Sequence, residues 1–234
     1  MSTGENGGDA GGAAARLAWL ELQDGTFPAG RFVHSAGLEA WLGAHPGADE
    51  EAVGSVVAAH LSGSVATLDA VFLAAAWRAP GRAPELDDQL TAYKTSAAAR
   101  SASEGAGRQL AFAATRVVPG ADRVAYLGAV GAEAVPGNQA VVDGVVSRHA
   151  GVGVEDAVLG FLRGAAAGLL SAAVRLGRIG PLSARRLGFA MHPDIAALTC
   201  VALGTSEADV YTATPELEIH AMRHERSTGR LFTT

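Results

Sequence analysis

The stretch EDAVLGFLRGAAAGLLSAAVRLG, residues 155–177, predicts a long helix and with it the fold class. Two acidic residues at its start favour the positive end of a helix dipole, and Gly177 follows its last turn. Its larger apolar residues recur at helical spacing: Val158, Phe161, Leu162, Leu169 and Leu170. The apolar run between Arg163 and Arg175 is shorter than the about twenty residues that span a bilayer. We therefore expect this helix in the core of a soluble protein.

The same helical spacing recurs along the rest of the chain, and no stretch alternates apolar and polar residues as a strand does. Asp49 is a typical N-cap, and two helices are expected after it, separated by a weak point near Gly54 and Gly63. The stretch APGRAP, residues 79–84, predicts a break in the helical structure. Another helix is expected over 13–23, with Leu17 and Leu20 facing the core, and the next from 31 to 42. Further along the chain, helices are expected within 85–118, over 124–134 and over 139–150. The last helix is expected to begin at Pro181. Leu86, Leu90, Tyr93, Leu110 and Phe112 are the core candidates of 85–118.

These patterns predict an all-α, single-domain helical bundle of about eight to ten helices over residues 13–205. Residues 1–12 have nothing to bury, so we expect a disordered N-terminal tail there. Residues 206–234 turn polar and are interpreted as a C-terminal interaction tail, which either folds back onto its own domain or docks on a partner.

Composition narrows the class of protein. The chain has 234 residues, 49 % of them hydrophobic but only 6 % aromatic, and 30 are glycine, which favours close packing of helices through small side chains. Gly37, Gly105 and Gly107 are expected at helix starts or close crossings. The net charge of −6 gives no reason to expect nucleic acid or an anionic membrane. The single cysteine, Cys200, excludes an internal disulfide, and the N-terminus lacks a secretory signal, so a cytoplasmic location is expected.

The residues that could carry chemistry form no complete set. His220 and His224 are four residues apart and Glu225 follows, but the chain has no HExxH motif and no third ligand at a fixed offset. Ser35 and Glu39 could share one helix face, yet they lack a suitable base. The sequence also lacks the nucleophile elbow and the phosphate-binding loop. We therefore expect no enzyme, no metal site and no bound cofactor, with a metal-dependent enzyme and an unrelated helical interaction module as alternatives.

Four short motifs, in order, resemble the urease accessory protein UreF family. They are FPAGRFVHSAGLE at 27–39, SASEGAGRQL at 101–110, the small-residue helix and turn from 161 to 187, and LEIHAMRHERSTGRLF at 217–232. The sequence departs from the family pattern at Arg31, where many members have glycine, and at Ala36.

The resemblance implies a non-enzymatic, all-α maturation factor that dimerises. It would sit between UreD, called UreH in some organisms, and the GTPase UreG in the assembly that delivers nickel to apo-urease. Nickel and GTP would be handled by the complex. The partner-binding residues expected on this basis are Arg31, His34, Ser35, Glu39, Arg108, His224, Glu225, Arg230, Leu231 and Phe232.

Overall fold

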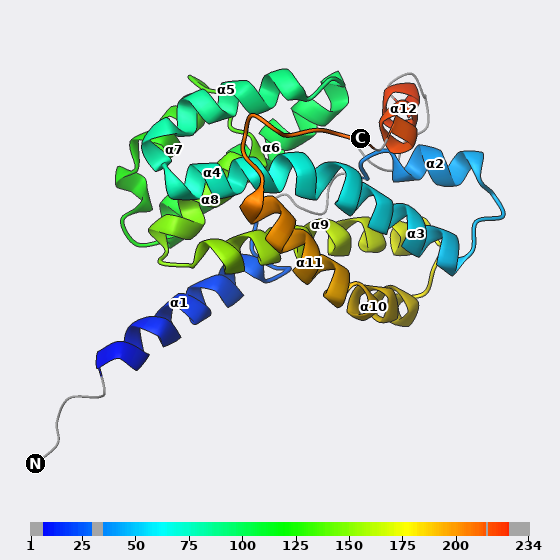
Figure 1. The fold of residues 1–234 in the computed structure, drawn as a ribbon, viewed down its shortest axis with the longest axis horizontal. Coiled ribbons are helices and arrows are strands. Elements are labelled where there is room, and N and C mark those ends of the chain that lie inside the picture. Colours follow the sequence, from blue (N-terminus) through cyan, green and yellow to red (C-terminus); the bar gives the residue numbers. More distant parts are fainter. Residues whose placement is uncertain (1–6, 30–34, 214, 225–234) are drawn as a thin grey trace, which may run out of the picture.

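All regular structure in the described part of the chain is helical, which confirms the predicted all-α fold. The computed structural model describes residues 7–29, 35–213 and 215–224 (Figure 1). The α-helices are α1 (Gly7–Gln23), α2 (Leu38–Ala44), α3 (Glu50–His60), α4 (Ala70–Arg78), α5 (Ala83–Tyr93), α6 (Ala97–Val117), α7 (Ala125–Gly131), α8 (Gln139–His149), α9 (Val154–Arg175), α10 (Pro181–Ala190), α11 (His192–Gly204) and α12 (Pro215–His224). Short helical segments of other types are the π-helix η1 (Leu61–Asp69) and the 3₁₀ turns η2 (Pro80–Arg82) and η3 (Ala121–Arg123).

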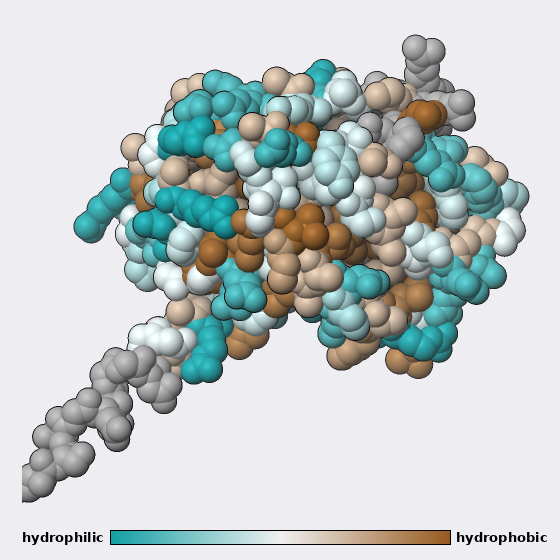
Figure 2. All heavy atoms as spheres, viewed as in Figure 1, coloured by the Kyte–Doolittle hydropathy of each residue, from teal (hydrophilic) through white to brown (hydrophobic). Residues whose placement is uncertain are grey.

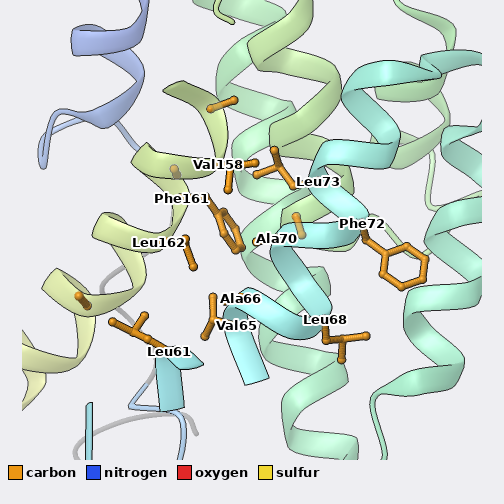
Figure 3. Packing of buried hydrophobic residues seen from close by; sticks show 14 of the residues in the cluster. Leu61, Val65, Ala66, Leu68, Ala70, Phe72, Leu73, Val158, Phe161 and Leu162 are labelled. Atoms are coloured by element: carbon orange, nitrogen blue, oxygen red, sulfur yellow. The ribbon is translucent and has the colours of Figure 1, made fainter. Parts of the chain in front are cut away.

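Helix α4 lies at the centre of the fold, against α8, α9 and α11. In Figure 3 the aromatic ring of Phe161, from α9, points toward Ala70 of α4, and Leu162 lies beside Val65 of η1. Each large apolar side chain removed from water in this way stabilises the fold by about 1.5–3 kcal/mol. The predicted helix 155–177 is confirmed as α9, and it forms one wall of this core.

Small residues let the central helices approach closely, as the composition predicted. A Cβ atom at Gly144 of α8 would lie 2.4 Å from the carbonyl oxygen of Leu73 in α4. A Cβ atom at Gly160 of α9 would lie 2.6 Å from the side chain of Gln23, which lets the end of α1 dock there. Trp19 of α1 completes this contact, because its indole N–H donates to the Asp156 carbonyl at 2.8 Å.

Residues 50–78 form one continuous helical rod rather than two separate helices. Asp49 caps its start as predicted, accepting the Ala52 N–H at 2.9 Å. Near Gly63, where we expected a weak point, the helix widens into η1 instead of breaking. The predicted break at 79–84 is confirmed by the end of α4 and the turn η2.

Two helices of the described chain are long and apolar enough to cross a membrane, Glu50–Arg78 and Val154–Arg175, and the bent pair α10 and α11 would make a third. The apolar run that we judged too short is therefore part of a helix that meets this criterion. The most apolar windows of the two helices are 67 % and 61 % buried inside the protein. Most of the residues in these apolar segments are thus buried in the core of the protein, which explains why the segments are so hydrophobic.

Several predicted boundaries near the N-terminus are wrong. Helix α1 begins at Gly7, so residues 7–12, which we expected in a disordered tail, extend the helix away from the body (Figure 1). Helix α2 begins only at Leu38, because Ala36 and Gly37 have positive φ angles of 47° and 84° that no right-handed helix accommodates. The part of the predicted 31–42 helix at 31–34 lies outside the described residues.

Some predicted core positions are exposed. Leu86, Leu90 and Leu110 are buried as predicted, but Tyr93 and Phe112 are about half exposed. Leu17 and Leu20 also face outward, since only the end of α1 packs on the body. Helical spacing identifies an apolar face but does not say whether another helix covers it.

The chain beyond residue 205 folds back onto its own domain as far as the structure describes it. Two helices follow the one that begins at Pro181, so that helix is not the last. The segment before α12 runs along η1, where the Tyr211 and Ala213 amides donate to the Thr67 and Gly63 carbonyls at 3.3 and 2.6 Å. Helix α12 then packs on α2 and α6, with Leu217 buried.

Candidate functional site

The helices that carry parts of the first and last sequence motifs meet in the structure. Helix α2 carries the end of the first motif, and α12 carries the described part of the last one, and the two helices pack side by side. The Trp41 indole N–H donates to Oε1 of Glu216 at 2.7 Å, which links residues 175 positions apart. We call this contact the α2–α12 joint.

Two histidines complete the α2–α12 joint. The imidazole of His45 stacks on the Trp41 ring with centroids 4.5 Å apart, and its Nδ1 lies 2.9 Å from the Trp41 carbonyl oxygen. Its Nε2 lies 4.0 Å from Oε1 of Glu216. The His220 ring lies edge-on to His45 at 6.0 Å. One potential ligand atom from each of His45, Glu216 and His220 lies within 4.8 Å of the others.

The second sequence motif forms another contact between distant segments. Gly107 of α6 faces the turn before α8 so closely that a Cβ atom would lie 1.9 Å from the Gly137 carbonyl oxygen. Arg108 donates to the Pro136 carbonyl at 3.2 Å and lies 3.6 Å from Glu104, the ion pair that its spacing allows. The motif therefore holds the turn that precedes α8.

A buried carboxylate holds this turn from the other side. Asp87 of α5 is fully buried and accepts the backbone N–H groups of Gly137 and Asn138 at 2.7 and 2.8 Å. It also accepts the Tyr126 hydroxyl at 2.8 Å. Burial, and then the negative charge of Asp87, raises the pKa of Tyr126 well above its usual value. Tyr126 thus remains a neutral donor, and the group has a structural role.

His60, at the end of α3, is a buried titratable group whose pKa is shifted by its surroundings. Burial lowers the pKa of His60 to about 4. The positive charge of Lys94 adds to this effect, whereas the negative charge of Asp69 opposes it. Lys94 and Asp69 pair at 2.7 Å. Among the described residues, Nδ1 of His60 has no hydrogen-bond partner. At neutral pH this imidazole is therefore uncharged.

A groove of about 420 Å³ lies between α9 and α10. Ser171 and His192 both line it, together with Arg163, Arg185 and mostly small or apolar side chains. No carboxylate is among its described lining residues. Among these described residues, none supplies the acidic group that would orient a histidine for nucleophilic catalysis.

The predicted partner-binding residues are placed differently from one another. Ser35 is buried, so its side chain belongs to the interior and not to an open surface, and Glu39 is half-buried on α2. Arg108 is partly exposed and engaged in the contacts given above. His224 ends α12, where only its backbone is described. Arg31, His34, Glu225, Arg230, Leu231 and Phe232 lie outside the described residues.

The α2–α12 joint brings together residues that sequence reasoning missed. Trp41, His45 and Glu216 were not candidate site residues. The four-residue spacing of Trp41 and His45, and of Glu216 and His220, places each pair on one helical turn. That spacing was the available signal, but it does not show that the two pairs face each other.

Comparison with known proteins agrees with the motifs. The UreF family model matches residues 47–192. The chain is 30 % identical over 220 residues to the urease accessory protein UreF of Paenarthrobacter aurescens (strain TC1), covering 94 % of this chain and 98 % of that protein. It is 30 % identical to the UreF of Arthrobacter sp. (strain FB24), covering 93 % and 96 %, and 26 % identical to that of Bacillus sp. (strain TB-90), covering 92 % and 97 %. The resemblance is confirmed: the chain belongs to the UreF family.

Proposed function

We propose that this chain is a urease maturation factor. In this role it scaffolds a UreD-like (UreH-like) protein and a UreG-like GTPase for GTP-dependent insertion of nickel into apo-urease. The observation that carries the proposal is the similarity to proteins named urease accessory protein UreF over more than nine-tenths of the chain. Family membership also argues against the alternative of a helical module unrelated to urease.

The described residues suit a scaffold better than an enzyme. The described lining residues of the groove between α9 and α10 include no carboxylate, and the buried polar groups Asp87 and Tyr126 hold a turn. Of the residues considered above for metal chemistry, Glu225 lies outside the described chain and only the backbone of His224 is described. The structure brings His220 to His45 and Glu216 instead. We propose that the chain acts without catalysis of its own and that the complex handles nickel and GTP.

Exposed apolar surface supports a role in binding proteins. Hydrophobic residues form a band across the face shown in Figure 2, over α11, whose Val201 is exposed. Leu182 and Phe189 of α10 are 86 % and 70 % exposed. Contiguous apolar surface of this kind marks protein interfaces. We propose that such faces serve a homodimer and its UreD-like and UreG-like partners in the cytoplasm.

The test is reconstitution of urease activity from apo-urease, Ni²⁺, GTP and the UreD-like and UreG-like proteins of the same host, with and without this chain. Urease activity is expected only when the chain is present, together with co-purification of the three accessory proteins. Full activation in its absence would refute the maturation role.

The tail is tested separately, because deletion from Thr214 would also remove α12 with its buried Leu217. The sharper variant combines Arg230→Ala, Leu231→Ala and Phe232→Ala and leaves α12 intact. Its control is Thr233→Ala with Thr234→Ala. We expect only the first variant to lose co-purification with the UreD-like protein, at an unchanged thermal midpoint. Equal retention by both variants would remove the tail from the proposal.

A further inference from the structure

We infer that His45, Glu216 and His220 form a binding site for one divalent transition metal ion, of the Zn²⁺ or Ni²⁺ class, between α2 and α12. The three residues come from two helices at opposite ends of the chain, and their potential ligand atoms already lie within 4.8 Å of one another. This site replaces our expectation that the chain has no metal site. It does not depend on the proposed role in urease maturation.

The hydrogen bond of His45 prepares its other nitrogen for a metal. A carbonyl oxygen can only accept, so Nδ1 of His45 carries the proton that it donates to the Trp41 carbonyl at 2.9 Å. In the neutral ring Nε2 then carries the lone pair, and this is the atom that lies 4.0 Å from Glu216. A backbone carbonyl that accepts the second N–H is the usual support of a metal-binding histidine.

Glu216 is held in a similar way. The Trp41 N–H bonds Oε1 at 2.7 Å, which orients the carboxylate toward α2 and leaves further lone pairs for a metal. Trp41 thus supports two of the three ligands, one through its backbone carbonyl and one through its side chain. Stacking of its ring on His45 further restricts the imidazole.

The geometry needs only a small adjustment. Metal–nitrogen and metal–oxygen bonds of about 2.0–2.2 Å place tetrahedral ligand atoms roughly 3.4 Å apart. The separations of 4.0 Å and up to 4.8 Å must therefore close by about 1 Å, within reach of side-chain rotation. The side chains of His45 and Glu216 are 44 % and 61 % exposed, which gives them that freedom and gives an ion direct access from solvent.

The ligand set indicates the class of ion. Two imidazoles and one carboxylate suit Zn²⁺ and Ni²⁺, whereas Mg²⁺ and Ca²⁺ prefer oxygen ligands throughout. Three protein ligands also leave a position for water or an incoming ligand. A bound ion would tie α12 to α2 in addition to the hydrogen bond of Trp41.

The experiment is calorimetric titration of the untagged full chain with NiCl₂ or ZnCl₂, beside MgCl₂. One Ni²⁺ or Zn²⁺ ion is expected per chain, with no binding of Mg²⁺, and the two arms show which ion binds more tightly. Loss of an outer-shell partner costs roughly ten- to a hundredfold in affinity, so the affinity should fall by at least that factor in each of His45→Asn, Glu216→Gln and His220→Asn. His192→Asn on α11 is the matched control, because this histidine lies outside the site. The affinity of this variant for the metal ion should equal that of the unaltered chain.

Tryptophan fluorescence gives a second readout. Paramagnetic Ni²⁺ beside His45 should quench the stacked Trp41 in proportion to occupancy, and Trp41→Phe should lose that quenching while Trp19 and Trp77 still emit. Absence of stoichiometric Ni²⁺ and Zn²⁺ binding by the unaltered chain would overturn the inference. So would unchanged affinity in folded His45→Asn, or loss of binding in His34→Asn while His45→Asn still binds. All of these measurements use the isolated chain, so their failure is distinct from failure of urease activation.

Discussion

Gly107→Ala should strongly destabilise the protein, whereas Gly105→Ala, two residues earlier in α6, should not. Alanine has a helix propensity about 1 kcal/mol more favourable than glycine, so both changes carry the same gain from this term. A Cβ atom at position 105 meets nothing within 4 Å, but at position 107 it lies 1.9 Å from the Gly137 carbonyl oxygen. The pair therefore isolates the cost of one contact.

The magnitude follows from what must move. A carbon and an oxygen in contact need roughly 3.3 Å, so the turn at Gly137 must retreat by more than 1 Å. That turn is held by two backbone N–H bonds to buried Asp87, at 2.7 and 2.8 Å. Overpacking costs about 1–3 kcal/mol, and loss of one hydrogen bond to a charged group costs about 1.5–3 kcal/mol. After the gain in propensity, Gly107→Ala should lose about 3 kcal/mol of unfolding free energy.

The assay is urea unfolding followed by far-ultraviolet circular dichroism and tryptophan fluorescence, with coincident curves required for a two-state treatment. Gly105→Ala should be as stable as the unaltered chain or up to about 1 kcal/mol more stable. Gly107→Ala should also lower the thermal midpoint by roughly 6–12 °C at this chain length. Equal stability of the two variants would show that the turn at Gly137 does not pack against Gly107. It would refute the conclusion that the second motif holds this turn.

Three further changes test other parts of the structure. The pKa of His60 is lowered to about 4 in the folded protein, so the unfolded chain binds the proton first as pH falls. The unfolding free energy, measured with urea, should therefore drop by about 2 kcal/mol from pH 7 to pH 5 through this group. The variant His60→Leu should not show this contribution to the loss. Tyr126→Phe takes one donor from buried Asp87 and should cost about 1.5–3 kcal/mol in the same assay; no change would contradict its role. Trp41→Phe removes the bond to Glu216 and should speed amide exchange in α12, but not in α8; unchanged exchange would mean that other contacts hold α12.

Much of the helical layout could be predicted because its signals are local. Several correct predictions depend only on residues within a turn or two of each other: the Asp49 cap, the break at 79–84, and the helices α8 and α9. Predictions were wrong where local signals were ambiguous. Helix α1 starts earlier than expected, and the expected helix start before Leu38 is excluded by backbone angles at Ala36 and Gly37.

Exposure was less predictable than helix position. Leu110 and Phe112 lie on the same helix and are both strongly apolar, yet one is fully buried and the other is half exposed. The same holds for Leu22 and Leu20 of α1. Which side chain is covered depends on the neighbouring helix, and periodicity in one helix contains no information about that neighbour.

By itself, the sequence determined that this protein is all-α, where most of its helices lie and to which family it belongs. Helix caps, apolar spacing and short motifs each depend only on residues that are close together in the sequence. Only the tertiary structure decided that Gly107 meets the turn at Gly137, and that His45 meets Glu216 and His220. The bond that joins Trp41 to Glu216 spans 175 positions. Such contacts arise when packed helices bring distant segments together, and no local signal specifies them.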